Sequence, residues 1–345
     1  MRVSFAAARL AAIAVFVACA SGCGGPQITG ATHATTRPPS STTSPSPASP
    51  SPASPSQALL GGTAPKAARA LPRTLYGVTV DDVSNLSDIV ASAQHLPQMP
   101  VTRVYFDVTL PVSYYQRAIS QLHPVSYLMG ELLDSSDEAG ISTAAFDQRV
   151  RSFVAAYGSE IDLWEIGNEV NGSWTGPYQV VAAKLIAAYH DVSASGGRTA
   201  LTLYYDAGCG NGPAELDPIA FTRKFVPSEV QNGLTYVFLS YYEPDCNGIR
   251  PSAGTWTSYF QALHVLYPNA RLGFGEIGIR QPVTSGTMGT ATSMINYYYG
   301  LPVHLPYYAG GYFWWYYDED CLPYATKPLW QALRAGFEAE AASQR

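Results

Sequence analysis

Eight short apolar runs alternate with helical patterns through the second part of this 345-residue chain. The runs have the composition of buried β-strands and lie at 75–80, 102–108, 126–129, 161–166, 200–205, 236–241, 271–275 and 311–315. Between them apolar side chains recur with helical spacing, as at Phe146, Val150, Phe153 and Tyr157. Strands that alternate with helices predict an α/β fold with a parallel sheet, and eight such units predict a single (β/α)₈ barrel over 71–345.

A doubly wound α/β sheet is the main alternative to a barrel. Dinucleotide-binding folds of that kind carry a GxGxxG segment between an early strand and its helix. The chain has no such segment there, and the glycine-rich stretch at 208–212 lacks the spacing and leads into Pro213. The sequence therefore favours the barrel.

The first residues have the pattern of an export signal. Arg2 and Arg9 supply positive charge, and the apolar run at 11–18 is too short to span a bilayer. Small residues at 20–22 precede Cys23, which resembles the bacterial lipobox, where a signal peptidase cuts before a cysteine that carries lipid. We expect 1–23 to be a lipoprotein signal peptide with lipid on Cys23. An ordinary secretory signal with an incidental cysteine is the alternative.

Residues 24–70 have the composition of a disordered linker. Pro, Ser, Thr and Ala dominate them, and the pentapeptide at 44–48 is repeated at 49–53. Such a segment has few large apolar side chains to bury and favours the extended polyproline II conformation. Together with the signal it predicts an extracytoplasmic protein, either lipid-anchored to the membrane or secreted, whose only membrane contact is the N-terminal lipid.

The composition constrains the binding partner. Charged residues make up 13% of the chain against a typical ~25%, and the formal net charge is −6. An acidic balance argues against nucleic acid or another polyanion as partner. The 24 Tyr residues fit a neutral sugar polymer, whose ring faces and hydroxyls they can contact, although Tyr can also simply cover an extracellular surface.

Three of the five cysteines lie in the expected barrel. In an exported protein two of them are expected to form a disulfide. Cys209 and Cys246 follow the fifth and sixth strands, which are neighbours in a barrel, so we expect them to pair and Cys321 to be left over. None of the cysteines or histidines has the spacing of a metal site, and we expect neither metal nor cofactor.

Two glutamates close strand-like runs at their carboxyl ends. Glu169 ends the run that starts at Trp164, and Glu276 follows the run at 271–275. In a (β/α)₈ barrel the carboxyl ends of the strands meet at one face, so both side chains are expected there. Two facing carboxylates are the groups needed to cleave a glycosidic bond, and retention of configuration requires them roughly 5–5.5 Å apart.

The sequence Trp-Glu-Ile-Gly-Asn-Glu at 164–169, with a second glutamate ending strand seven, resembles the clan A retaining glycoside hydrolases. This clan of (β/α)₈ barrels includes the cellulase/mannanase, arabinofuranosidase and heparanase-like families. The resemblance implies that Glu169 is the general acid/base and Glu276 the nucleophile. It also implies that Asn168 hydrogen-bonds the sugar 2-hydroxyl.

Further site residues follow from the same resemblance. Arg103 on strand two is expected to donate to Glu276, or else to form a structural salt bridge inside the barrel. Tyr242 is preferred to Tyr241 as the tyrosine that contacts the nucleophile.

Trp314 and Trp315 end strand eight, where the clan places a tryptophan under the sugar; one of them is expected there and the other in the core. The acidic residues 318–320 could bind a cation or sugar hydroxyls, but we expect them to be solvated loop charges.

The sequence thus predicts a monomeric retaining glycosidase acting on an extracellular, neutral polysaccharide or oligosaccharide. Endo action is favoured because the chain ends soon after the last expected barrel helix. An exo-acting, arabinofuranosidase-like glycosidase is one alternative. The other is a glycan-binding surface lipoprotein without activity, which would have no need of a matched acid and nucleophile.

Overall fold

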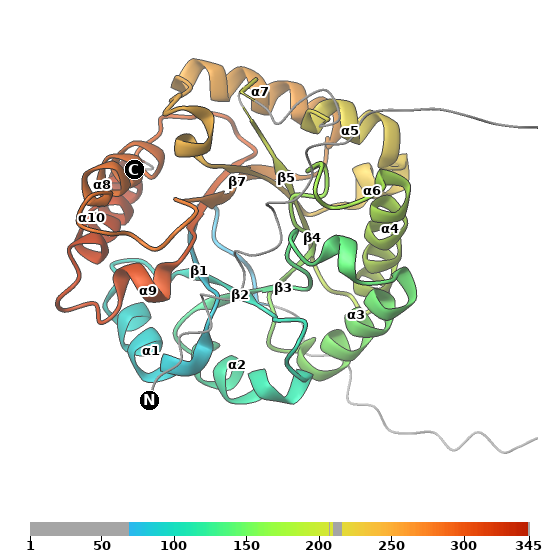
Figure 1. Cartoon of the computed structure of the whole chain (residues 1–345), viewed down its shortest axis with the longest axis horizontal. Helices are drawn as coiled ribbons and strands as arrows, with labels where there is room; N and C mark the ends of the chain where they lie inside the picture. The colour runs from blue at the N-terminus through green and yellow to red at the C-terminus, as the bar shows by residue number, and fades with distance from the viewer. Residues whose placement is uncertain (1–68, 207, 210–215, 344–345) are drawn as a thin grey trace, which may run out of the picture. The chain divides into compact units, whose positions relative to one another are not determined.

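A computed structural model describes residues 69–206, 208–209 and 216–343. Eight parallel strands pair in sequence order and close into one barrel, seen end-on in Figure 1. The strands are β1 (Leu75–Val80), β2 (Val101–Tyr105), β3 (Tyr127–Glu131), β4 (Leu163–Gly167), β5 (Thr199–Tyr204), β6 (Tyr236–Tyr241), β7 (Arg271–Ile277) and β8 (Tyr308–Trp314). The predicted (β/α)₈ fold is therefore confirmed.

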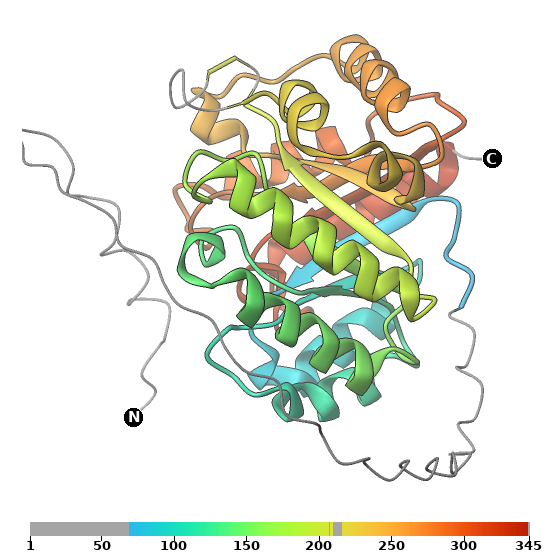
Figure 2. The same cartoon turned by 90° about the vertical axis from the view of Figure 1, so that its right-hand side faces the viewer.

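Helices surround the strands, and Figure 2 shows α3 and α4 lying side by side along the outside of the barrel. The helices are α1 (Leu86–His95), α2 (Gln116–Leu122), α3 (Thr143–Tyr157), α4 (Tyr178–Ala194), α5 (Pro218–Phe225), α6 (Ser228–Gly233), α7 (Ala253–Leu266), α8 (Met288–Tyr298), α9 (Tyr317–Cys321) and α10 (Pro328–Ser343). Short 3₁₀ turns lie at η2 (Val83–Asn85), η3 (Val112–Tyr115), η4 (Glu138–Gly140) and η5 (Glu243–Cys246).

The expected apolar face of α3 is buried against the barrel. Phe146, Val150, Phe153 and Tyr157 are all at most 5% exposed, and Ser142 caps the helix by accepting a hydrogen bond from the backbone of Ala145. Burying this stripe is what holds the helix on the sheet, since isolated helices of this length are marginal in water.

The barrel interior has an apolar base and a polar upper part. Nine buried apolar residues from β1 to β8 form a cluster separate from the helix-facing core. They are Leu75, Val101, Met129, Leu163, Ala200, Tyr236, Phe238, Ala309 and Phe313. Two positions further along β2, β3 and β4, the interior side chains are Arg103, Glu131 and Glu165. The nine apolar side chains, which we call the apolar base, therefore separate these charged groups from the end of the barrel where the strands begin.

Two expectations about individual elements were wrong in detail. Strand two was expected to run to residue 108, but β2 ends at Tyr105, and Phe106 packs on Phe153 of α3 at a ring separation of 4.2 Å. The acidic residues 318–320 form part of α9 rather than a solvated loop. Asp320 is buried and accepts hydrogen bonds from the Trp314 indole (2.9 Å) and the Val283 backbone (2.6 Å).

Arg69, two residues before the expected boundary at residue 71, contacts the barrel. Arg69, the first described residue, forms an ion pair with Asp162 (2.5 Å) and donates to the carbonyls of His123 and Ser126 (both 2.8 Å). The signal segment, Cys23 and all but the last two residues of the expected linker lie outside the described residues.

Candidate active site

Glu169 and Glu276 lie at the carboxyl ends of β4 and β7, as the sequence predicted for a shared face. Both are buried, with 7% and 3% of their surface exposed. Glu169 has a left-handed backbone (φ 44°), a conformation that costs energy for a residue with a side chain. Such strain persists where surrounding contacts impose it, and it is common at functional sites.

Three donors surround the carboxylate of Glu276. Arg103 Nη1 lies 2.7 Å from Oε1, and Asn168 Nδ2 donates to the same oxygen at 2.7 Å. The Tyr242 hydroxyl donates to Oε2 at 2.6 Å. Both oxygens of this carboxylate are thus held, one by an ion pair and an amide and the other by a phenol.

Glu169 has different surroundings. Its carboxyl oxygens accept from the hydroxyls of Ser240 (2.5 Å) and Ser135 (3.0 Å), and Ser240 is the register partner of Glu276 across β6 and β7. Burial, and next the charge of Glu276, raise the pKa of Glu169 well above its ordinary value. These surroundings favour the protonated form of Glu169.

Tyr242 and Asn168 are fixed for their contacts with Glu276. Burial, and next the charge of Glu276, raise the pKa of Tyr242, so its hydroxyl keeps the proton that it donates. The Asn168 side-chain oxygen accepts from the Ser135 backbone at 3.0 Å, which orients the amide toward Glu276. Tyr241, the rejected candidate, donates to the Ile249 carbonyl instead.

Arg103 makes both of the contacts that the sequence left as alternatives. Besides Glu276, it donates through Nε to Glu165 (2.6 Å) and lies with Nη2 3.0 Å from Glu131. Burial opposes its charge, but the three carboxylates outweigh this and raise the pKa of Arg103. It is thus at once a structural ion pair and a support for Glu276.

The two tryptophans of strand eight separate into different roles. Trp315 is partly exposed, and the Arg103 guanidinium lies 5.2 Å from the centre of its ring. Trp314 is fully buried and donates to Asp320. Only Trp315 therefore lies at the candidate site. Trp314 lies in the helix-facing core, so it is the one of the two that is not placed to contact a substrate.

Three residues of the site were missed from the sequence. Ser135 and Ser240 contact Glu169, and the Trp174 indole nitrogen donates to the Ser135 hydroxyl at 3.1 Å. Trp174 is partly exposed and lies in the loop between β4 and α4. Ser240 did carry a signal, because it is a polar residue inside the otherwise apolar run of β6, two positions before Tyr242.

The structure joins Cys209 and Cys246 in a disulfide, with their Cα atoms 5.3 Å apart. This is the pair expected from the barrel order. Cys321 is a buried free thiol in α9.

Among the residues that the structure describes, no three His, Cys, Asp or Glu side chains are grouped so that they could hold a metal ion. No helix within the same residues combines the length and the apolar character that crossing a membrane requires.

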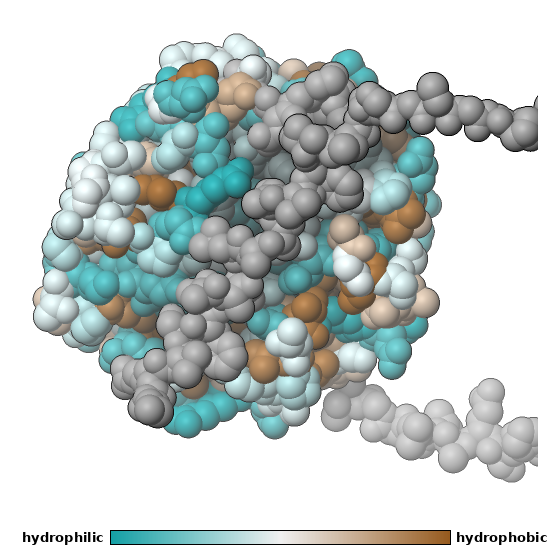
Figure 3. Space-filling view, in the orientation of Figure 1, coloured by the Kyte–Doolittle hydropathy of each residue, from teal (hydrophilic) through white to brown (hydrophobic). Residues whose placement is uncertain are grey.

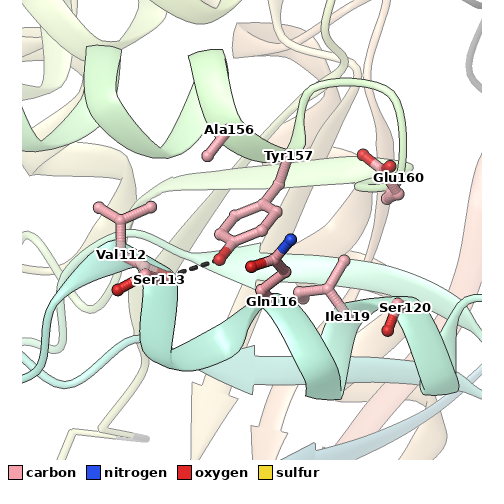
Figure 4. A pocket seen from close by; sticks show the side chains of 8 residues that line it. All are labelled: Val112, Ser113, Gln116, Ile119, Ser120, Ala156, Tyr157 and Glu160. Carbon is pink, nitrogen blue, oxygen red and sulfur yellow. Dashed lines mark hydrogen bonds between the residues drawn. The ribbon is translucent and has the colours of Figure 1, made fainter.

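A pocket of about 480 Å³ lies outside the barrel between α2 and α3 (Figure 4). Glu160 supplies the one carboxylate among the eight described residues that line it, and the Tyr157 hydroxyl donates to the Val112 carbonyl. The pocket lacks the paired carboxylates found at the ends of β4 and β7, so we assign it no role in the chemistry.

Comparison with known proteins finds similarity in structure only. No family model matches the chain, and no curated protein matches it. A GH10 xylanase from Bispora sp. MEY-1, solved with xylobiose, is 12% identical with a TM-score of 0.53, over 76% of this chain and 96% of the xylanase. A family 1 β-glucosidase from Thermotoga maritima is 12% identical with a TM-score of 0.50, over 74% and 86%.

The virulence factor SghA from Agrobacterium tumefaciens is 13% identical with a TM-score of 0.50, over 77% of this chain and 98% of SghA. At these identities the likeness shows a shared (β/α)₈ fold. The xylanase and the β-glucosidase thus have the (β/α)₈ fold that the motif at 164–169 led us to expect.

Proposed function

We propose that this protein is a retaining glycoside hydrolase, with Glu169 as general acid/base and Glu276 as nucleophile. The observation that carries the proposal is the contrast between the two carboxyl groups. Glu169 is favoured as the protonated acid, whereas Glu276 is surrounded by Arg103, Asn168 and Tyr242. An acid and a nucleophile set apart by their surroundings are what double displacement requires.

In the first step a carboxylate oxygen of Glu276 attacks the anomeric carbon. The bond from this carbon to the leaving oxygen breaks, and the proton of Glu169 passes to that oxygen. The product is a glycosyl ester on Glu276, with Glu169 now ionised. Loss of negative charge from Glu276 weakens its contact with the Asn168 amide, which is then available to the sugar 2-hydroxyl.

In the second step the ionised Glu169 takes a proton from water. The water oxygen attacks the anomeric carbon, and the ester bond to Glu276 breaks. Arg103 and Tyr242 stabilise the carboxylate that leaves. The reaction regenerates both groups, inverts the anomeric centre twice, and as proposed uses no cofactor.

A neutral polysaccharide or oligosaccharide is the substrate class we propose. Trp315 and Trp174 are partly exposed; Trp315 directly follows β8 and Trp174 lies in the loop after β4, two strands on opposite sides of the barrel. Aromatic rings on both sides suit a chain of sugars that extends beyond the bond being cleaved, and favour endo over exo action. The xylanase and the β-glucosidase with the same fold support a saccharide substrate.

Chemical rescue tests this proposal. Glu169→Ala should lose most activity on substrates with poor leaving groups, because protonation of the leaving oxygen is the function it lacks. It should keep more activity on activated aryl glycosides, and added azide should restore turnover. Glu276→Ala should lose turnover on every substrate. Full activity in either variant would contradict the proposal, and sugar binding without any wild-type turnover would favour a binding protein.

We also propose that the mature chain is anchored by lipid on Cys23 outside the cytoplasm and acts as a monomer. Small residues before Cys23 and the Pro- and Ser-rich stretch after it support the anchor. Mass spectrometry of the membrane fraction should find a diacylglyceryl-modified Cys23. A soluble chain that begins at another residue would contradict the anchor.

A further inference from the structure

One guanidinium faces three carboxylates directly beneath the candidate nucleophile. Arg103 contacts Glu165 through Nε, Glu276 through Nη1 and Glu131 through Nη2, at 2.6, 2.7 and 3.0 Å. The Arg103, Glu131 and Glu165 side chains are completely buried, and that of Glu276 is 4% exposed. Each nitrogen of the guanidinium therefore lies at ion-pair distance from a carboxylate, and among the described residues only the Nε contact is also a hydrogen bond.

The charges of this cluster do not balance if every group is ionised. Three carboxylates and one guanidinium leave two negative charges in an interior closed from below by the apolar base. Uncompensated buried charges are costly, and a buried carboxyl normally takes up a proton instead. At least one of the three is therefore expected to be neutral in the folded protein.

Local contacts distinguish the three carboxyl groups. Glu276 accepts hydrogen bonds from Asn168 and Tyr242 and forms an ion pair with Arg103, and the proposed reaction needs it ionised. Glu165 accepts hydrogen bonds from Arg103 Nε and from the Thr202 hydroxyl. Neither side-chain oxygen of Glu131 has a hydrogen-bond partner among the described residues, and its contact with Arg103 is the longest of the three.

We propose that Glu131 is held as an uncharged carboxylic acid beneath the site, where it leaves the charge of Arg103 to Glu165 and Glu276. The effect of Glu131 on Glu276 rests on the proposed function, whereas the protonation of Glu131 does not. Glu131 is a positioning residue, because it acts on the nucleophile through Arg103 and does not touch the reacting atoms.

The groups that face Glu131 agree with this assignment. They are Arg103 on β2, Glu165 on β4, Glu276 on β7 and Asp134 in the loop after β3. Burial raises the pKa of Glu131; Arg103 offsets part of this, and the three acidic groups add to the rise. Ionisation of Glu131 would add negative charge next to Glu276 and divide the charge of Arg103 among three partners. That would weaken the support for the carboxylate that leaves in the second step.

Unfolding as a function of pH tests the protonation without any substrate. If Glu131 is protonated in the folded state and ionised in the unfolded state, the wild type loses stability as pH rises above the ordinary glutamate range. Glu131→Gln is uncharged and does not have this loss. The Tm of Glu131→Gln minus that of the wild type should therefore become more positive, by about 3 °C or more, between about pH 5 and 8.

A Tm difference that stays flat between about pH 5 and 8 would overturn the proposal. If Glu131 were an ionised partner of Arg103, its folded state would bind the proton less well than the unfolded state, so the Tm difference would change only below about pH 5, where it would become more positive as pH falls. Glu338→Gln is a matched control, because Glu338 is about half exposed in a pair with Arg334, and its Tm difference should stay flat. Should Glu131→Gln not fold, Glu131→Met has a similar length and no charge, and gives the same comparison.

The positioning role has a separate readout. The ratio of kcat/KM for Glu131→Gln to that of the wild type should rise with pH by severalfold, because only the wild type can ionise at this position. The rise should be equal for good and poor leaving groups, since Glu131 acts on the nucleophile and not on Glu169. If this ratio of kcat/KM values did not change with pH, Glu131 would not act on the nucleophile, and its role would be structural only. An inactive wild type with the predicted Tm slope would refute the proposed function and leave the neutral Glu131 standing.

Discussion

Glu169 and Glu276 are chemically identical side chains, and the residues around them make them different. Two serine hydroxyls contact Glu169, whereas an arginine, an amide and a phenol contact Glu276. Because an acid must be protonated to donate, the raised pKa of Glu169 extends its useful form to higher pH.

Activity should therefore fall on the alkaline side as Glu169 loses its proton. Measured as kcat/KM against pH, this fall should begin well above the ordinary glutamate range for substrates with poor leaving groups. Substrates whose leaving groups need no protonation should show a weaker fall. An equal fall for both kinds of substrate would contradict the assignment of Glu169 as the acid.

Trp314 and Trp315 offer a matched pair for separating stability from binding. Trp314→Ala removes a fully buried ring and its bond to Asp320, so it should cost about 3–5 kcal/mol and lower the Tm strongly. Trp315→Ala should lower the Tm less but reduce kcat/KM on oligosaccharides by about tenfold or more, equivalent to ~1.4 kcal/mol of stacking. If instead Trp314→Ala lost more kcat/KM and Trp315→Ala lost more Tm, then Trp314 and not Trp315 would be the ring at the site.

The main ionisable residues of the site could be predicted from the sequence, but not all of their neighbours. Glu169, Glu276 and Arg103 are polar residues in or next to apolar strand runs, which is an unusual pattern. Ser135 lies in a loop, where serine is common and carries no signal. Trp314 and Trp315 could not be told apart, because β8 departs from regular register and its alternation is lost.

At the scale of elements, β7 and β8 pack too closely for a side chain at their contact. A Cβ added at Gly311 would lie 2.3 Å from the Phe274 carbonyl oxygen, and Gly311 has φ 96°. Both the clash and the backbone conformation exclude other residues. Phe274 lies two residues before Glu276, so this contact also sets the position of the proposed nucleophile.

Gly311→Ala should therefore destabilise the protein by more than about 1 kcal/mol and reduce activity together with it. Gly289→Ala in α8 is the control, because an added Cβ there meets nothing within 4 Å, and it should be neutral or slightly stabilising. Thermal unfolding of the two variants checks the prediction. Equal Tm values would show that β8 can move away from β7.

Element types were easier to predict than element ends. Strand runs were recognisable because they are apolar on both faces, as buried parallel strands must be. The end of β2 was misplaced because Phe106 continues the apolar run, although its ring packs on α3 after the backbone has left the sheet. α9 was missed because its acidic sequence resembles a solvated loop, while Asp320 is in fact buried by its bond to Trp314.

At the scale of the whole molecule, the closed barrel followed from the count of strands and helices. The number of strands and helices does not predict how far along the barrel axis each interior side chain lies, because that position depends on the register between neighbouring strands. The described face in Figure 3 shows apolar residues scattered rather than gathered, and the most exposed ones, such as Met99, Val180 and Val265, lie on different elements. Single exposed residues of this kind are normal and indicate no docking surface.

The disulfide joins the loop after β5 to η5, which follows β6, across 37 residues of sequence. Closing a loop of that length is worth up to about 4 kcal/mol in the chain-entropy model. A Cys209→Ser, Cys246→Ser double variant should therefore have a clearly lower Tm, whereas Cys321→Ser should not reproduce the loss. Non-reducing peptide mapping should link Cys209 to Cys246, and a link from Cys246 to Cys321 would contradict the pairing.

Trapping of the covalent intermediate tests the central claim most directly. A 2-fluoro sugar with a good leaving group slows both steps, and the second more than the first, so the glycosyl-enzyme should accumulate. We expect peptide mapping by mass spectrometry to find the sugar on Glu276, and Glu276→Gln to remain unlabelled. Labelling of any other residue, or inverted product from a slow substrate followed by NMR, would contradict a retaining mechanism with Glu276 as nucleophile.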